Sequence, residues 1–197
     1  ATMFSQNVNN KYYITNYVYN RAVEAVNLNG DTSRTWRLNS EGSTNGDFIT
    51  VQDLDSNRGV VYSNYRSGGT NRIIAYHSWD DFEDADRNTN APNIIMTGSL
   101  DGNVSAIKVS PYTTDSSTIF VGTESGSVFK VTNADTADAN DNSTANWSNI
   151  TGSQFLGSVS DIEFGKDENH LFVTFHNYGV ENIFYSEDGG QSWTEKE

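Results

Sequence analysis

The chain has 197 residues, 26 of them acidic and 12 basic, which gives a formal net charge of −14. Its acidity argues against nucleic acid or an anionic membrane surface as a partner, and the absence of cysteine excludes disulfides and thiolate metal sites. Val and Ile total 26 against 6 Leu, and 12% of the residues are aromatic, a composition that favours strands over helices.

The first two units of the chain, residues 1–45 and 46–100, contain short β-type runs bounded by Gly, Asn, Asp or Ser. This spacing is typical of antiparallel strands joined by turns rather than of strand–helix–strand units. In the first unit we expect strands at Tyr12–Val18, Ala22–Leu28 and Thr35–Leu38, with a weak inner strand near Met3–Ser5. In the second we expect strands at Phe48–Val51, Val60–Tyr65, Arg72–Tyr76 and Ile94–Met96.

The third and fourth units, residues 101–152 and 153–197, repeat one another. Val104–Ile107 is echoed by Val159–Ile162 at an offset of 55 residues, and a Thr-Gly-Ser tripeptide precedes each run. Further strand-like runs follow in both units: Ile119–Gly122 and Ser127–Val131, then Leu171–Phe175 and Asn182–Tyr185. The repeat predicts two equivalent four-stranded antiparallel sheets without a helix of two or more turns.

Four units of roughly fifty residues, each a four-stranded antiparallel sheet, match the length and strand number of propeller blades. We therefore predict an all-β fold and a single β-propeller module of about four blades over residues 1–197. An open arc of blades would leave apolar faces uncovered. Such an arc calls for pairing of two copies in a homodimer or for further blades in a longer chain, and closure of a four-bladed ring is the rival outcome.

The sharpest motif is Ser186-Glu-Asp188-Gly-Gly190-Gln-Ser192-Trp193. It resembles the Asp-box, or BNR repeat, of β-propellers in the sialidase, sortilin and xyloglucanase-like superfamily. A degenerate copy runs from Asn29 to Trp36 and contains Asp31. Trp147 closes another copy, which an acidic insertion interrupts.

The resemblance implies a structural role for the motif, as a hairpin on the rim of a blade away from the binding face. An Asp side chain can accept backbone N–H groups of its own turn, and Gly supplies a positive φ. The residues that this assigns to structure rather than catalysis are Ser186, Asp188, Gly190, Ser192, Trp193, Asp31 and Trp36.

Catalysis is the weaker hypothesis, because a sialidase would need an arginine cluster and an Arg-Ile-Pro context. The nearest match, Arg72-Ile-Ile, lacks the proline. Another type of glycosidase needs only two carboxylates at a suitable separation. Among 26 acids, Asp161, Glu163 and Glu124 are candidates that the sequence does not distinguish.

A metal site has one weak candidate, the alternating oxygen ligands Asp53, Asp55 and Asn57, which resemble part of a calcium loop. The segment lacks the glycine and the bidentate glutamate of such a loop. We therefore favour a turn between two strands and expect no cofactor, with calcium as the alternative. His77, His170 and His176 are far apart in sequence and follow strand-like runs, which favours core or rim positions over metal ligation.

Propellers bind partners with the loops at one mouth of the ring, and loops carry function in general. Residues in or near turns that could bind sugars or extended peptides are Tyr65, Arg66, Trp79, Phe82 and Tyr178. We expect a non-catalytic module that binds carbohydrate or a protein partner. Its acidic, Asn/Thr/Ser-rich, cysteine-free composition resembles secreted bacterial propellers and implies an extracellular or cell-envelope location. The alternative is part of a sialidase-like or xyloglucanase-like glycoside hydrolase.

Overall fold

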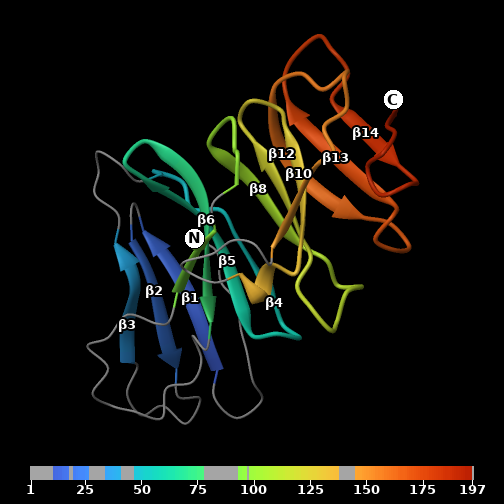
Figure 1. Cartoon of the computed structure of the whole chain (residues 1–197). Helices are drawn as coiled ribbons and strands as arrows, with labels where there is room; N and C mark the ends of the chain where they lie inside the picture. Colours follow the sequence, from blue (N-terminus) through green and yellow to red (C-terminus); the bar gives the residue numbers. More distant parts are fainter. Residues whose placement is uncertain are drawn as a thin grey trace.

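The computed structural model describes residues 11–17, 20–26, 34–40, 47–77, 93–96, 98–137 and 145–196. These residues form four antiparallel sheets, here called the first to fourth sheets in chain order. Figure 1 shows the sheets following one another through the molecule. The fold is all-β, as the repeat predicted.

The first sheet has three described strands, β1 (Lys11–Tyr17), β2 (Asn20–Val26) and β3 (Arg34–Ser40). Its expected inner strand near Met3–Ser5 lies outside the described residues. The first sheet contacts the second through a hydrogen bond of 2.7 Å from Asn16 Nδ2 to Gln52 Oε1.

The other three sheets are four-stranded meanders, in which each strand pairs with the next in sequence. The second sheet contains β4 (Gln52–Asp55), β5 (Val60–Ser67), β6 (Thr70–His77) and β7 (Asn93–Met96). The third contains β8 (Val104–Val109), β9 (Ile119–Thr123), β10 (Val128–Thr132) and β11 (Asn146–Asn149). The fourth contains β12 (Ser158–Phe164), β13 (Leu171–His176), β14 (Ile183–Ser186) and β15 (Thr194–Glu195).

The prediction of two equivalent four-stranded sheets in residues 101–152 and 153–197 is confirmed. Helical structure within the described residues is one turn of 3₁₀ helix, Ala134–Thr136. The equivalence extends to irregularities, because the register shifts between Val104 and Ala106 in the third sheet and between Val159 and Asp161 in the fourth. These two β-bulges lie at positions related by the 55-residue offset.

The position of the inner strand of the second sheet differs from the one predicted from the sequence. The sequence predicted Phe48–Val51, whereas the strand is β4, four residues later. Phe48 and Ile49 are 67% and 72% exposed. β4 carries two aspartates in four residues: Asp53 accepts a hydrogen bond from Val109 of β8, and Asp55 accepts one from Ser117 in the loop between β8 and β9. Those bonds let acidic residues occupy a largely covered strand.

Among the residues that the structure describes, two apolar cores lie between successive sheets. Between the second and third sheets the core includes Tyr62, Ile73 and Val121, all fully buried. Between the third and fourth it includes Phe120, Leu171 and Val173, again fully buried. Apolar packing against the adjacent sheet therefore provides most of the stabilisation of each sheet.

Gly122 sets the distance between the third and fourth sheets. A Cβ atom built at this position would lie 2.4 Å from Cγ1 of Val159. We expect Gly122→Ala to lower the free energy of unfolding by about 1–3 kcal/mol, the usual cost of overpacking a core. Urea denaturation of the variant measures the loss. Adding Val159→Ala should recover part of it, and a simple sum of the two losses would contradict this explanation.

Candidate functional site

The candidate site is a pocket of about 540 Å³ where three sheets meet. Its walls come from the segment before β4, the second half of β5, the starts of β8 and β12, the hairpin after β9 and the end of β13. These inner strands all begin at this mouth of the molecule, so their first residues and the adjacent hairpins converge. The lining residues are Asp47, Phe48, Ile49, Val51, Asn64, Arg66, Asn103, Val104, Ser105, Glu124, Ser158, Val159, Ser160 and His176.

Both β-bulges open onto this pocket. Ser105 and Ser160 are the extra residues of the two bulges, and both line the wall. Bulges redirect a side chain out of the alternation of a strand and are frequent next to binding sites. The repeated Val-Ser pair is therefore the sequence signal that could have pointed to the pocket.

The charged groups of the pocket are partly held in place. Asp47 Oδ2 accepts a hydrogen bond of 2.9 Å from Asn64 Nδ2, and Glu124 Oε2 accepts one of 2.9 Å from Asn103 Nδ2. Among the described residues, Ser105 Oγ and Arg66 Nε are buried and have no hydrogen-bond partner. Buried polar atoms normally have partners, so these two atoms are suited to bonding with a ligand.

Of the residues singled out in the sequence, the pocket brings together Arg66, Glu124 and His176. Asp161 and Glu163 lie on β12 but do not line the pocket, and Tyr178 is fully exposed in a loop elsewhere. Trp79 and Phe82 fall outside the described residues. Sequence reasoning missed Asp47 and the exposed pair after it, because it assigned that pair to a strand.

The motif residues begin at the last residue of β14 and form the hairpin after it, where they make a compact hydrogen-bond network. Asp188 Oδ1 accepts the Ser192 amide at 2.9 Å and the Ser186 hydroxyl at 2.8 Å. Ser186 Oγ in turn accepts the Gly190 amide at 2.8 Å. Gly189 and Gly190 have φ of 73° and 90°, which only glycine adopts without strain. The motif residues thus bond mainly with one another.

The same network predicts a pH dependence. Hydrogen bonds from the hydroxyl and amide of Ser192 hold the pKa of Asp188 at about 2, against an ordinary value of 3.8. A lowered pKa stabilises the fold above the unfolded value, and this contribution disappears as the pH falls from about 4 to about 2. Urea denaturation across this range should show Asp188→Asn losing less stability on acidification than the wild type. Equal losses would contradict the assignment.

Trp193 and Trp147 make equivalent contacts with the segments between sheets. The Trp193 ring lies against Gly152, and its Nε1 donates a hydrogen bond of 2.8 Å to Ile150 O. Trp147 lies against Gly98, where a Cβ atom would come within 2.7 Å of the ring. Both glycines belong to the repeated Thr-Gly-Ser tripeptides. In the degenerate first copy, Asp31 and the side chain of Trp36 lie outside the described residues.

In the candidate calcium segment, Asp53 and Asp55 lie in β4 rather than in the predicted turn, and only Asn57 lies in the turn into β5. Asp55 Oδ1 accepts the amides of Asn57 and Arg58, and Oδ2 accepts the Ser117 hydroxyl at 2.6 Å. Asp53 Oδ2 accepts the Val109 amide at 2.7 Å. Burial raises the pKa of Asp53 above its ordinary value, against the opposing effect of the hydrogen bonds that Asp53 accepts from the amides of Val109 and Leu54. Calcium would have to compete with all of these hydrogen bonds.

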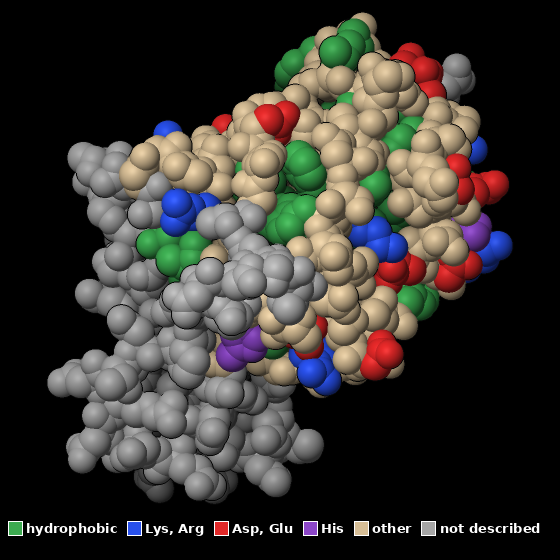
Figure 2. Space-filling view, viewed as in Figure 1, with side chains coloured by type: hydrophobic (Ala, Val, Ile, Leu, Met, Phe, Trp, Pro, Cys, Tyr) green, Lys and Arg blue, Asp and Glu red, His purple; other side chains and the backbone are tan. Residues whose placement is uncertain are grey.

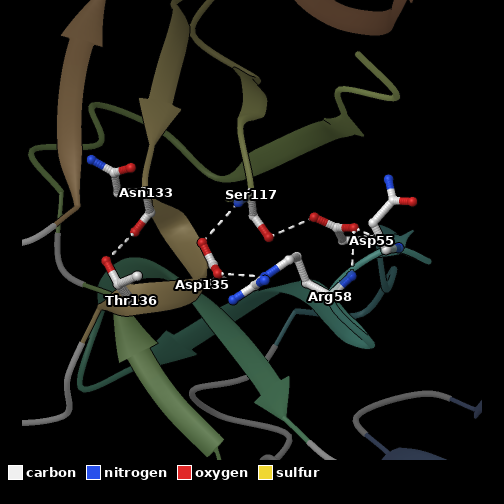
Figure 3. Close-up of polar contacts among 7 residues, drawn as sticks. Asp55, Arg58, Ser117, Asn133, Asp135 and Thr136 are labelled. Atoms are coloured by element: carbon white, nitrogen blue, oxygen red, sulfur yellow. Dashed lines mark hydrogen bonds and ion pairs between the residues drawn. The ribbon is translucent and has the colours of Figure 1, made fainter. Parts of the chain in front are cut away.

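Figure 3 shows how this turn joins the second and third sheets. Ser117 donates its hydroxyl to Asp55 and its amide to Asp135 Oδ1 at 2.7 Å. Asp135 also pairs with Arg58 at 2.8 Å. The histidines are dispersed: His77 ends β6, His176 ends β13, and His170 bonds to Asp167 at 2.6 Å. Within the described part of the chain, no three His, Asp or Glu side chains form a cluster that could hold a metal ion.

No helix among the described residues is long and apolar enough to cross a membrane. No family model matches the chain. No curated protein is significantly similar to it in sequence.

Among solved structures, the chain is similar to YCF48 from Cyanidioschyzon merolae, a β-propeller protein. The TM-score is 0.65 at 15% sequence identity, and the match covers 99% of this chain and 55% of YCF48. The chain therefore spans about half the length of the propeller it resembles. At this level of identity the likeness concerns the fold, and it agrees with the four successive sheets: the chain has a β-propeller fold.

Proposed function

We propose that this chain is a non-catalytic propeller module that binds its ligand in the pocket at the mouth of the inner strands. The observation that carries the proposal is the convergence of three sheets on one pocket of about 540 Å³, within the range of small-molecule sites. Propeller proteins resembling this chain in fold include YCF48, which is consistent with a module of this kind.

The ligand class that suits the pocket best is carbohydrate. The lining combines hydroxyls and amides with an exposed aromatic ring, Phe48, and the apolar side chain of Ile49. An exposed aromatic side chain beside convergent hydrogen-bonding groups matches a sugar, which has an apolar face and polar edges. Since the chain carries a net charge of −14, a neutral sugar suits it better than an anionic one. A peptide loop of a protein partner is the second candidate ligand.

A glycan-array screen, run beside a hydrolysis assay on the same sugars, identifies the ligand. For the sugar that binds, we expect Phe48→Ala and Arg66→Ala each to raise the Kd at least tenfold, about 1.4 kcal/mol. Tyr178→Ala is the matched control, because Tyr178 is an exposed aromatic outside the pocket, and it should leave the Kd unchanged. Binding that survives both pocket substitutions would place the ligand elsewhere.

Glycoside hydrolysis is the alternative function, and one observation favours it. Two carboxylates, Asp47 and Glu124, line the same pocket. Turnover of an array sugar that is lost in both Asp47→Asn and Glu124→Gln would establish the enzyme. Binding of the sugar without turnover supports the non-catalytic binding module.

We also propose that residues 186–193 are an Asp-box and that the hairpin has a structural role. The bonds among Ser186, Asp188 and Ser192 support this, as does the packing of Trp193 on Gly152. Asp188→Ala should therefore lower stability without changing ligand affinity. An extracellular or cell-envelope location goes with the proposal, and fractionation of the producing cells would test it.

A further inference from the structure

One side-chain position recurs at the mouth of the second, third and fourth sheets. In each of these sheets the first residue of the inner strand pairs with a residue of the next strand, and the recurring position follows that partner in sequence. We call the residues at this position the mouth residues. They are Asn64, which follows Ser63, Glu124, which follows Thr123, and Asn177, which follows His176.

Each mouth residue bonds to the segment that leads into the inner strand of its own sheet. Glu124 Oε2 accepts a hydrogen bond of 2.9 Å from Asn103 Nδ2, directly before β8. Asn177 Nδ2 donates one of 2.5 Å to Leu156 O, just before β12. The same position therefore fixes the approach to the inner strand in three sheets.

Asn64 makes the most extensive set of these bonds. Its side chain is buried, with the residue only 1% exposed, and Nδ2 donates to Asp47 Oδ2 and to Ile49 O, both at 2.9 Å. Oδ1 accepts the Val51 amide at 3.0 Å. The amide thus uses both its donor and its acceptor functions on residues 47–51. Four of these five residues line the pocket, so one side chain holds a wall of the candidate site.

Asn64 also ends the pairing between β4 and β5. The Asn64 amide donates to Val51 O at 3.1 Å, as in a hydrogen-bonded pair of an antiparallel ladder. In such a pair the Val51 amide would return a bond to the Asn64 carbonyl, but it bonds to Asn64 Oδ1 instead. The side chain replaces the backbone acceptor, and the segment before Val51 leaves the sheet. This departure leaves Phe48 and Ile49 exposed at the pocket.

We propose that Asn64 is a positioning residue of the candidate binding site, whose side-chain amide fixes residues 47–51 as the wall that contacts the sugar. The inference rests on the proposed function, since that function gives the wall its ligand. A carboxylate at position 64 would still accept the Val51 amide, but it would have no donor for Asp47 or for Ile49 O. The position therefore requires an amide rather than any polar group.

The charge environment makes Asn64→Asp a sharp test. Figure 2 shows acidic side chains exposed on the surface, several beside Lys or Arg. A carboxylate at position 64 would instead be buried and would face Asp47 directly, where water screens the repulsion less. The other charged or titratable side chains of the pocket are Arg66 on β5, Glu124 after β9 and His176 at the end of β13.

Hydrogen exchange of the Val51 amide tests the positioning without any ligand. At pH 7 we expect Asn64→Asp to speed this exchange about tenfold relative to the wild type, because repulsion loosens the wall. At pH 5 the two carboxyl groups hold one proton between them and one donates to the other, so the ratio should fall to about threefold or less. Asn64→Ala has no group to protonate at position 64 and should exchange faster than the wild type at both pH values.

A second variant separates like-charge repulsion from a general loss of folding. Asn64→Asp combined with Asp47→Asn places a donor opposite an acceptor again, with the two groups exchanged. It should show slower Val51 exchange than Asn64→Asp at pH 7 and no recovery at pH 5. Far-UV circular dichroism of each variant checks that the sheets are intact.

The neutral sugar selected on the glycan array then reports on the use of the wall. We expect Asn64→Asp to raise its Kd about tenfold at pH 7 and about threefold or less at pH 5, each relative to the wild type at the same pH. Because the wild type is measured at both values, titration of His176 enters both sides of the comparison. Asn177→Asp is the matched control, since Asn177 is the mouth residue of a segment outside the pocket, and it should leave the Kd unchanged.

Unchanged Val51 exchange in Asn64→Asp at pH 7 would overturn the inference. So would faster exchange with an unchanged Kd, provided that Arg66→Ala weakens binding of the same sugar. If neither Asn64→Asp nor Arg66→Ala changes the Kd, the sugar binds elsewhere and the proposed function fails with the inference. If no array sugar binds, the proposed function fails, and the exchange measurements alone decide whether Asn64 fixes the wall.

Discussion

Replacing Trp193 with alanine is expected to lower the free energy of unfolding by about 3 kcal/mol, the lower end of the range for deleting a large packed aromatic side chain. The ring packs on Phe155, with centroids 5.1 Å apart, and on Gly152. Its Nε1 also bonds to Ile150 O. The substitution therefore removes the contact of the last hairpin with the segment that joins the third and fourth sheets. Urea denaturation followed by far-UV circular dichroism measures the loss.

Trp193→Phe is the matched control for this experiment. It keeps an aromatic ring against Phe155 but loses the hydrogen bond to Ile150, so it should cost about 1 kcal/mol. If Trp193→Ala stayed within about 0.5 kcal/mol of the wild type, the ring would not hold the hairpin in place.

Replacing Asp55 with alanine is expected to lower the free energy of unfolding by about 3 kcal/mol. The Asp55 carboxylate is almost completely buried and accepts three hydrogen bonds, two from turn amides and one from the Ser117 hydroxyl. Each polar group left buried without a partner costs about 1–3 kcal/mol, and partial access of water to the turn reduces the sum. Thermal and urea unfolding both measure this loss.

Two substitutions separate the parts of this network. Ser117→Ala removes one donor and leaves the turn bonds of Asp55 in place, so we expect a loss of about 1 kcal/mol. Arg58→Ala breaks an ion pair whose arginine side chain is 42% exposed, and it should cost less than about 1 kcal/mol. A larger loss in Arg58→Ala than in Asp55→Ala would mean that the ion pair, rather than the buried carboxylate, joins the two sheets.

The sequence was most informative where the chain repeats itself. The 55-residue offset predicted the equivalence of the third and fourth sheets, since identical Val-Ser bulges occur at matching positions. It was least informative at β4, where Asp53 and Asp55 resemble a loop or an ion site. Their carboxylates accept hydrogen bonds from β8 and from the loop that follows it, across separations of 56 and 62 residues. A local pattern cannot reveal such partners.

The candidate site was only partly predictable for a related reason. Arg66, Glu124 and His176 were singled out separately, as a loop cation, an acid and a rim histidine. Their common position depends on how three sheets are arranged around one mouth. The apolar pair Phe48-Ile49, between Asp47 and Thr50, predicts a strand, whereas the structure leaves the Phe48 side chain exposed. Whether such a side chain is buried depends on how the neighbouring sheets pack, which the local sequence does not reveal.

The packing of each sheet against the adjacent one has a consequence for how the molecule opens. When neighbours alone stabilise a unit, stability is approximately a sum of nearest-neighbour terms, and cooperativity decays along the array. The third sheet is covered by the second on one side and by the fourth on the other. Its amides should therefore exchange with deuterium more slowly than those of the fourth sheet, so that the molecule opens first at the fourth sheet.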